Sequence, residues 1–288
     1  LSFNESLSLQ CEKGYIIWNW IISHSGFDYH AYLLFTAAII YYSLCRFIYR
    51  YSTCAWLSIV AFMAFGFYFG TLHILRQYLA LAIIMFAYDY MLKRKLLHFT
   101  ALVLLAFSFH TSAIVFFPTY FICNKNIKTP VIVSIFLGCI MLAYFAGKML
   151  FGYLFLTEKY AKVYVEAADA AGSGYSMLAL LTAITVISLI FKPRHLSDEN
   201  KPFYWTFYLA SFAQPFATIV SMVSRGILYW ITTVSVFLPL VVNNIKNKFI
   251  QVLAYIVVTL GLIAFFEMAA NAEEGVETYA TYEFYDPK

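Results

Sequence analysis

Two arginines stand in stretches of sequence that are otherwise apolar. Arg76 lies in TLHILRQYLALA and Arg225 lies in VSMVSRGILYW. A charged group within a membrane segment costs free energy and usually faces a cavity, a partner or a ligand. Each guanidinium can grip two phosphate oxygens with its planar fork of N–H donors. The pair predicts a phosphate-binding site, and the alternative left open is that each arginine only anchors its helix at the membrane surface.

Polar side chains accompany each arginine at helical spacing. His73 and Gln77 fall within one turn of Arg76, and Tyr229 follows Arg225 by one turn. Hydroxyl, amide and imidazole groups in these positions would lie on the same helix face as the guanidinium. We therefore expect them to contact whatever the arginines bind.

His110 is the third signal, in the apolar run LAFSFHTSAIVFFP. The ordinary histidine pKa of about 6.5 suits proton transfer near neutral pH, so His110 is predicted to act as a general base or a hydrogen-bond donor. The alternative left open is a structural histidine, with one ring nitrogen held by a neighbour. The candidate neighbours are Ser108, Thr111 and Ser112.

Glu12, in CEKGYIIWNWI, is the acidic residue nearest the start of a predicted amphipathic helix. An acid there stabilises the helix dipole. Its alternative role is to contact a ligand hydroxyl or to orient one of the arginines.

Common catalytic and cofactor motifs are absent from the sequence. It contains no nucleophile elbow, P-loop, HExxH or GxGxxG, and no pair of aspartates resembles a DxD metal site. The five cysteines have no metal-binding spacing. No basic cluster is interleaved with aromatic residues as on a nucleic-acid surface. We therefore expect no cofactor, no metal and no nucleic-acid partner.

The composition indicates which elements position these residues. The chain is 62% hydrophobic and 12% charged, with a mean hydropathy of +0.75, whereas soluble domains carry about 25% charged residues. The apolar runs are continuous, which favours helices over the alternating strands of a barrel. The sequence predicts an all-α, polytopic integral membrane protein, a single domain over 1–288 with about nine to ten membrane-embedded helices.

We expect an interfacial helix at 15–23, followed by a series of membrane segments. The segments are 29–45, 54–72, 75–92, 96–109, 111–123, 130–147, 176–191, 203–223, 226–243 and 249–267. The region 96–123 is too long for one span and too short for two. If it turns back at His110, 12 of the 19 Lys and Arg residues lie on the cytoplasmic side, against about 10 for a single crossing. We therefore predict a turn at His110, recessed in the outer half of the membrane.

One loop outside the membrane is long enough to contribute to a site. Residues 148–175 form an expected outer loop, in which TEKYAKVYVEA reads as a short amphipathic helix with Tyr160 and Tyr164 one turn apart. The chain begins at Leu1 without a signal-peptide pattern, and we expect that some N-terminal sequence precedes it.

A set of motifs in order along the chain resembles a known family. EKGY and WNW are followed by LRQYLALAIIMFAYDYMLKRK, then by LLHFTALVLLAFSFHTSAIVFFPTYF, and last by SRGILYW ahead of VFLPLV. This order is similar to that of the EpsG-like family of bacterial exopolysaccharide and capsule polymerases, which have a Wzy-type role. The resemblance spans about Glu12 to Pro239. The family usually has a further N-terminal helix and a Gly-x-Asp…Tyr motif ahead of EKGY, and this chain lacks both.

The resemblance implies a glycosyltransferase that joins polysaccharide repeat units carried on undecaprenyl diphosphate, at the outer face of the bacterial plasma membrane. Arg76 and Arg225 would hold the diphosphate, and His110 would take a proton from the acceptor hydroxyl or orient it. Sugars would be positioned by Gln77, Tyr229, Tyr160 and Tyr164. The implied partners are the polyprenyl-diphosphate-linked oligosaccharide, membrane lipids and other polysaccharide assembly proteins.

Two other classes remain open at this point. A transporter or flippase of lipid-linked sugars would use the same arginines without chemistry, although the paired half-repeats common in transporters are not evident. A membrane O-acyltransferase would also need a buried histidine, but its expected Asn- or Asp-containing partner motif is not evident.

Overall fold

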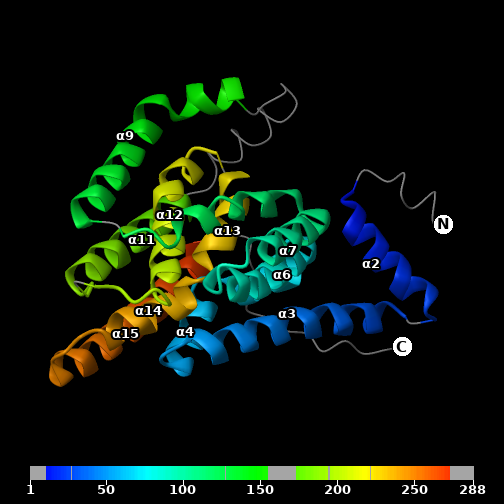
Figure 1. The fold of residues 1–288 in the computed structure, drawn as a ribbon, viewed down its shortest axis with the longest axis horizontal. Coiled ribbons are helices and arrows are strands. Elements are labelled where there is room, and N and C mark those ends of the chain that lie inside the picture. The colour runs from blue at the N-terminus through cyan, green and yellow to red at the C-terminus, as the bar shows by residue number, and fades with distance from the viewer. Residues whose placement is uncertain are drawn as a thin grey trace.

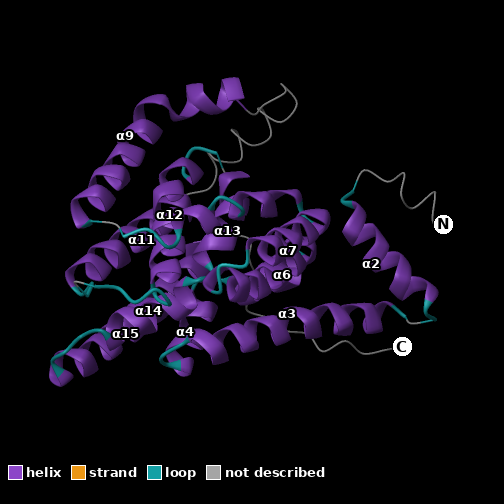
Figure 2. Cartoon of the chain, in the orientation of Figure 1, coloured by secondary structure: helices purple, strands orange, loops and turns teal. Residues whose placement is uncertain are grey.

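The computed structural model describes residues 11–26, 28–126, 128–154, 173–193, 195–220 and 222–272. Within these ranges every regular element is a helix (Figures 1 and 2). The predicted sugar-contacting residues Tyr160 and Tyr164 lie outside the described residues.

The helices follow the predicted order closely. The first half contains α2 (Lys13–His24), α3 (Tyr29–Tyr51), α4 (Ala55–Ala64), α5 (Phe67–His73), α6 (Leu75–Leu92), α7 (Leu96–Phe109), the 3-10 helix η1 (Thr111–Phe116) and α8 (Thr119–Ile122). The second half contains α9 (Thr129–Leu154), α11 (Ser173–Ile190), α12 (Lys201–Ala217), α13 (Met222–Ile231), α14 (Val234–Asn243) and α15 (Lys248–Ala272).

The number of helices long enough to cross a membrane is smaller than the nine to ten expected. By length and hydropathy, α3 and α15 can each span, and the bent pairs α4–α5 and α13–α14 raise the total to four candidates among the described residues. Shorter apolar stretches include α7 and, of α9, the part Thr129–Phe145. This set of helices indicates a multi-pass membrane protein.

Two segments predicted as continuous helices are bent, and each bend has a local cause. Between α4 and α5 the axis turns by 57° at Gly66, whose φ of 71° is a left-handed conformation that glycine adopts without strain. Between α13 and α14 it turns by 46°. There the hydroxyls of Thr232 and Thr233 donate to the carbonyls of Leu228 and Trp230, at 2.7 and 2.5 Å, and such back-bonding bends helices.

The central helices are α6 and α12, which are buried along most of their length. Tyr88 of α6 is 1% exposed, stacks on Phe203 of α12 with an interplanar angle of 2°, and contacts Phe116 of η1. Aromatic pairs of this kind add to the free energy gained from burial alone. They fix the position of α6, whose first turn carries Arg76 and Gln77.

The region 96–123 turns back on itself, as predicted. The Arg94 guanidinium, just before α7, donates to the Tyr120 carbonyl of α8 at 2.7 Å. Phe99 at the start of α7 also contacts the Tyr120 ring, with centroids 5.1 Å apart. The start of α7 and the end of α8 therefore lie together, and His110 lies at the far turn between α7 and η1.

Contacts gather many of the basic residues at one end of the molecule, which we call the basic end. Buried Asp89 at the end of α6 accepts hydrogen bonds from Arg46, from Arg50 at 3.2 Å and from Tyr51. The Trp205 indole of α12 donates to the Lys125 carbonyl at 2.8 Å. This end therefore brings together the last turns of α3, α6 and α8 and the first turns of α12. The positive-inside rule predicts that it faces the cytoplasm.

The topology can be tested by cysteine labelling in a cysteine-free background. Ser25, after α2, and Lys125, at the basic end, belong to opposite sides in the predicted topology. A membrane-impermeant maleimide added to intact cells is expected to label Ser25→Cys, and to label Lys125→Cys only after permeabilisation. Labelling of Lys125→Cys in intact cells, with Ser25→Cys protected, would invert the topology.

Candidate functional site

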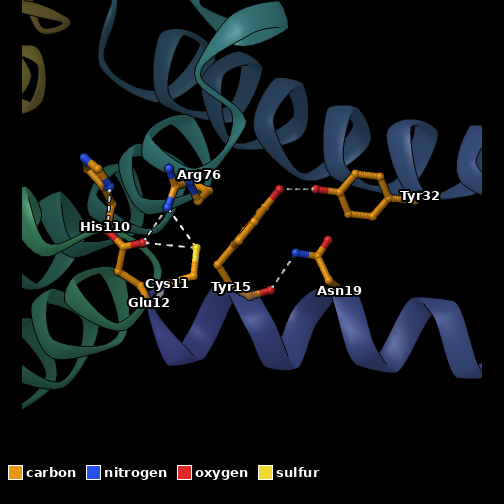
Figure 3. A network of polar contacts seen from close by, with 7 residues as sticks. All are labelled: Cys11, Glu12, Tyr15, Asn19, Tyr32, Arg76 and His110. Carbon is orange, nitrogen blue, oxygen red and sulfur yellow. Dashed lines mark hydrogen bonds and ion pairs between the residues drawn. The ribbon is translucent and has the colours of Figure 1, made fainter. Parts of the chain in front are cut away.

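One carboxylate joins three segments that are far apart in the sequence. Glu12, ahead of α2, places Oε2 at 2.8 Å from Nη1 of Arg76 and Oε1 at 3.0 Å from Nδ1 of His110. Arg76 lies in the first turn of α6, and His110 lies between α7 and η1. Figure 3 shows the guanidinium and the imidazole on either side of the carboxylate. We refer to these three residues as the carboxylate triad.

A glycine allows α2 to approach closely enough for this contact. A Cβ placed on Gly14 would lie 2.7 Å from the Ser108 carbonyl oxygen, closer than real Cβ atoms come to backbone. On its other side α2 is held to α3, where the Tyr15 and Tyr32 hydroxyls lie 2.9 Å apart and the Trp18 indole donates to Thr36 at 3.2 Å. The packing of α2 against α3 and α7 therefore determines where Glu12 lies.

Electrostatics keep Glu12 ionised at neutral pH. Burial by itself raises its pKa, but backbone N–H groups together with Arg76 and His110 outweigh burial and hold the pKa below the ordinary value of 4.5. Because the pKa of Glu12 is lower in the folded state than in the unfolded state, the ionised carboxylate stabilises the fold at pH values above its unfolded-state pKa. This stabilisation is lost as the pH falls through the folded-state pKa of Glu12. Glu12 is thus a carboxylate under physiological conditions.

An ionised carboxylate fixes the tautomer of His110. Because a carboxylate can only accept, Nδ1 of His110 must be the donor in this contact. When the imidazole is neutral, its proton is then on Nδ1, and Nε2 carries a free lone pair. His110 is 9% exposed, so it is shielded from most solvent. The arrangement gives an oriented imidazole that can accept a proton at Nε2.

Arg76 retains hydrogen-bonding capacity. Its recorded hydrogen bonds to described residues, to Glu12 at 2.8 Å and to Cys11 Sγ at 2.9 Å, both use Nη1. The side chain is 43% exposed. Because the guanidinium is planar, its hydrogen bond to Glu12 also fixes the direction of the Nη2 and Nε donors. These donors can bind an incoming anion.

Arg225 belongs to the same region, although it contacts the triad less directly. The Gln77 amide, beside Arg76 in α6, donates to the Arg225 carbonyl at 2.5 Å. Both Arg225 and Arg76 are close enough to His110 to interact with it electrostatically. Tyr229, one turn later, is 1% exposed, and its hydroxyl lies 3.2 Å from Ser112 Oγ. These contacts join α6, η1 and α13 around the two arginines.

A cavity of about 380 Å³ opens beside Arg225. Its polar lining includes Arg225, Gln77, Gln214, Ser224 and Tyr78. Neither Arg76 nor His110 lines it, so the triad and the cavity are neighbouring parts of one region, connected through Gln77.

Two sequence interpretations need correction or qualification. The alternative left open by the sequence is that Ser108, Thr111 or Ser112 holds one nitrogen of the His110 ring; among the described residues Glu12 holds Nδ1, and Ser108 Oγ donates to the Leu105 carbonyl at 2.7 Å. His73 is exposed at the end of α5 and does not line the cavity beside Arg225. A helix break at Ile74 separates it from α6, so the helical spacing to Arg76 is interrupted.

Sequence reasoning overlooked Gln214 and Tyr78. Gln214 is 5% exposed within α12 and donates to the Gly174 carbonyl at 3.3 Å. A buried amide in an apolar helix is itself a signal of a polar cavity, and the sequence offers this signal in LASFAQPFA. In the described part of the chain no three His, Cys, Asp or Glu side chains are grouped as metal ligands. The guanidiniums of Arg76 and Arg225 are cationic groups that the chain itself offers to an anion here.

Replacing Gly14 tests how the triad is assembled. Gly14→Ala should force α2 away from α7, because the new Cβ meets backbone, and overpacking of this kind costs about 1–3 kcal/mol. We expect a lower thermal unfolding temperature in detergent. Gly138→Ala in α9 is the matched control, since its Cβ meets nothing within 4 Å. Equal unfolding temperatures for the two variants would contradict the close packing at Gly14.

Comparison with known proteins places the whole of this region within one family. The model of the EpsG family matches residues 1–284, which include the carboxylate triad, Arg225 and the cavity beside it. No curated protein and no solved structure matches the chain. The match extends over nearly the whole chain and confirms the resemblance carried by the sequence motifs. The chain belongs to the EpsG family, which is associated with exopolysaccharide biosynthesis.

Proposed function

We propose that the protein is a polysaccharide polymerase that joins repeat units carried on undecaprenyl diphosphate at the outer face of the bacterial plasma membrane. The observation that carries the proposal is the carboxylate triad, in which Glu12 orients an imidazole and a guanidinium side by side. Family membership supplies the context of exopolysaccharide synthesis. Membrane lipids and other assembly proteins are the remaining proposed partners.

The proposed reaction uses His110 as general base. Nε2 takes the proton from the acceptor sugar hydroxyl as its oxygen bonds to the anomeric carbon of the donor. Glu12 stabilises the imidazolium that forms, as a carboxylate does when it accepts from the other ring nitrogen of a catalytic histidine. The bond between the anomeric carbon and the diphosphate oxygen breaks, and its electron pair leaves with undecaprenyl diphosphate.

The arginines have the complementary task of stabilising the leaving group. A diphosphate gains negative charge as the bond breaks, and fixed guanidinium donors lower the energy of that charge without rearranging. Arg76 is suited to this because its hydrogen bonds to the described residues, to Glu12 and Cys11, use Nη1 and not the other nitrogens of the fork. Arg225 is tied to α6 through its carbonyl, so the positions of both arginines depend on the same helix.

The cavity beside Arg225 supports a sugar ligand. Its volume of about 380 Å³ falls within the range typical of small-molecule sites. Amides from Gln77 and Gln214 line it together with the Ser224 hydroxyl, and such groups can exchange hydrogen bonds with sugar hydroxyls. We propose that this cavity holds the sugar next to the diphosphate. Tyr229 is fully buried and would act by positioning Ser112.

The rival function is a transporter or flippase of lipid-linked sugars. Such a protein would need cations for the diphosphate, and histidine–carboxylate pairs also serve as proton relays in transporters. We favour the enzyme because the triad places a proton acceptor beside a phosphate-binding guanidinium, as glycosyl transfer requires. The two functions give different results when His110 is replaced.

Arg76→Lys and Arg225→Lys should each reduce polymerisation by about 10–100-fold, because the charge remains while a charge-assisted hydrogen bond worth about 1.5–3 kcal/mol is lost. Polymer length in membranes containing lipid-linked repeat units measures the effect. The matched control is Arg50→Lys at the basic end, since Arg50 and Arg76 side chains are equally exposed at 43%. Normal polymer from both test variants would return these arginines to an anchoring role.

His110→Ala should lower turnover by about 10²–10⁴-fold, the usual contribution of general-base catalysis, while single lipid-linked units accumulate at the outer face. Glu12→Gln should cause a smaller loss in turnover, because the imidazole remains but loses its anionic partner. His98→Ala is the control, a histidine at the start of α7 stacked on Tyr90. Stably inserted His110→Ala protein that still makes long polymer would remove His110 from the mechanism, and repeat units retained at the inner face would favour the flippase.

A further inference from the structure

A second cavity lies at the basic end, far from the carboxylate triad. Its volume is about 660 Å³, and it is enclosed by the loop before α9, the first turn of α9, the end of α11 with the loop that follows, and the first turn of α12. Its lining contains four lysines and a histidine, namely Lys125, Lys128, Lys192, Lys201 and His195. No aspartate or glutamate is among the described residues that line it. We refer to it as the lysine pocket.

The backbone adds positive potential to the lysine pocket. Two long helices begin at its wall, α9 with Thr129 and Pro130, and α12 with Lys201. A helix N-terminus carries a partial positive charge and directs N–H groups outward, which favours an anion. The two helix N-termini and the lysines therefore both favour the binding of an anion.

The contacts of Lys125, Lys128 and Lys201 bring little negative charge to the pocket within the described residues. Lys201 Nζ pairs with Asp198 at 2.6 Å, but the Asp198 side chain is 82% exposed and so is well screened by water. Neither Lys125 nor Lys128 makes a recorded contact with a carboxylate in the part of the chain that the structure describes. Burial lowers the pKa of Lys192, because a low-dielectric surrounding disfavours the charged ammonium. A bound anion would stabilise this set of charges.

The rest of the lining is partly aromatic and apolar, as expected where a lipid headgroup and its acyl chains bind side by side. Trp205 is largely buried and holds the Lys125 backbone by its indole N–H at 2.8 Å, which fixes the loop that carries Lys125. Leu189 and Leu196 give the pocket an apolar side. The neighbouring turns of α9 and α11 expose Val131 and Ile190, at 45% and 68%. These faces are suited to acyl chains that continue from the pocket.

We propose that the lysine pocket binds a phosphate-bearing anion, and that the headgroup of an anionic phospholipid in the adjoining leaflet supplies it. Basic pockets between membrane helices on the cytoplasmic side commonly bind such headgroups. The lysines bind the phosphate as point charges, and the exposed faces of α9 and α11 accommodate the chains. The site is separate from the triad and stands whether or not the protein is a polymerase. A soluble phosphate compound shares the chemistry, and the test distinguishes the two sources.

The test measures binding to the purified full chain in neutral detergent. Phosphatidylglycerol and, in a separate arm, inorganic pyrophosphate are titrated while thermal unfolding is followed, with phosphatidylcholine as the neutral lipid. The test variant is Lys125→Gln with Lys128→Gln, both exposed residues whose replacement leaves the buried packing intact. The matched control is Lys93→Gln with Lys246→Gln, two exposed lysines outside the pocket lining that change the net charge equally.

We expect phosphatidylglycerol to raise the unfolding temperature of the unsubstituted protein, and the pocket variant to weaken its apparent affinity at least about tenfold, equivalent to about 1.4 kcal/mol. The control should change the affinity less than about twofold. If pyrophosphate binds with this dependence on the pocket and phosphatidylglycerol does not bind, the anion site stands. The phospholipid is then overturned as its source, and the anion is a soluble phosphate compound. Equal weakening by both variants, or no weakening by either, would overturn the lysine pocket as a specific site.

Discussion

The ion pair between Glu12 and Arg76 is the interaction on which the arrangement of the site depends. A carboxylate whose side chain is 15% exposed needs partners, and Glu12 finds them in Arg76 and His110. Satisfying this one group requires the start of α2, the first turn of α6 and the turn after α7 to meet. Removing the carboxylate would leave α2 held only by its contacts with α3 and α7, and would leave two potential cations facing each other. With a neutral His110, the Glu12 carboxylate offsets the charge of Arg76, and Arg225 brings a second guanidinium close to the triad. An anionic ligand would meet these two guanidiniums.

Part of the fold and of the site could be predicted from the sequence, and the remainder could not, for physical reasons that differ from feature to feature. The turn at His110 followed from the distribution of Lys and Arg, because membrane orientation depends on where the basic loops lie. The pairing of His110 with Glu12 did not follow, since 98 residues separate them and nearby serines and threonines are equally able to accept. The bends at Gly66 and at Thr232 and Thr233 depend on one left-handed residue and on hydroxyls bonded to their own helix, which hydropathy does not register. The family motifs indicated which residues belong to the site, but not which of their side chains contact one another.

The charged side chains at the two ends of α6 have different sets of polar contacts. At the basic end Asp89 is 8% exposed and accepts from Arg46, Arg50 and Tyr51, so its charge is enclosed by donors from α3. Aromatic packing around Tyr88 lies one residue away and ties the same turn of α6 to α12. The opposite end of α6 carries Arg76, whose hydrogen bonds to the described residues use Nη1 alone. One helix therefore has a closed polar network at its last turn and an open one at its first, and only the open one is free to exchange partners with a ligand.

The geometry of Glu12 bears on how proton transfer and phosphate binding are coordinated under the proposed function. Its two oxygens have different partners, Oε1 with the imidazole and Oε2 with the guanidinium. One rigid planar group thus sets the distance between the proton acceptor and the phosphate clamp. Glycosyl transfer needs the acceptor hydroxyl and the departing diphosphate on the same anomeric carbon at the same moment, and misplacement by about 1 Å can reduce the rate of such a step about 10²-fold. A carboxylate shared by both partners links their positions directly. Packing at Gly14 then matters to the chemistry, because displacement of α2 would move the imidazole and the guanidinium relative to each other.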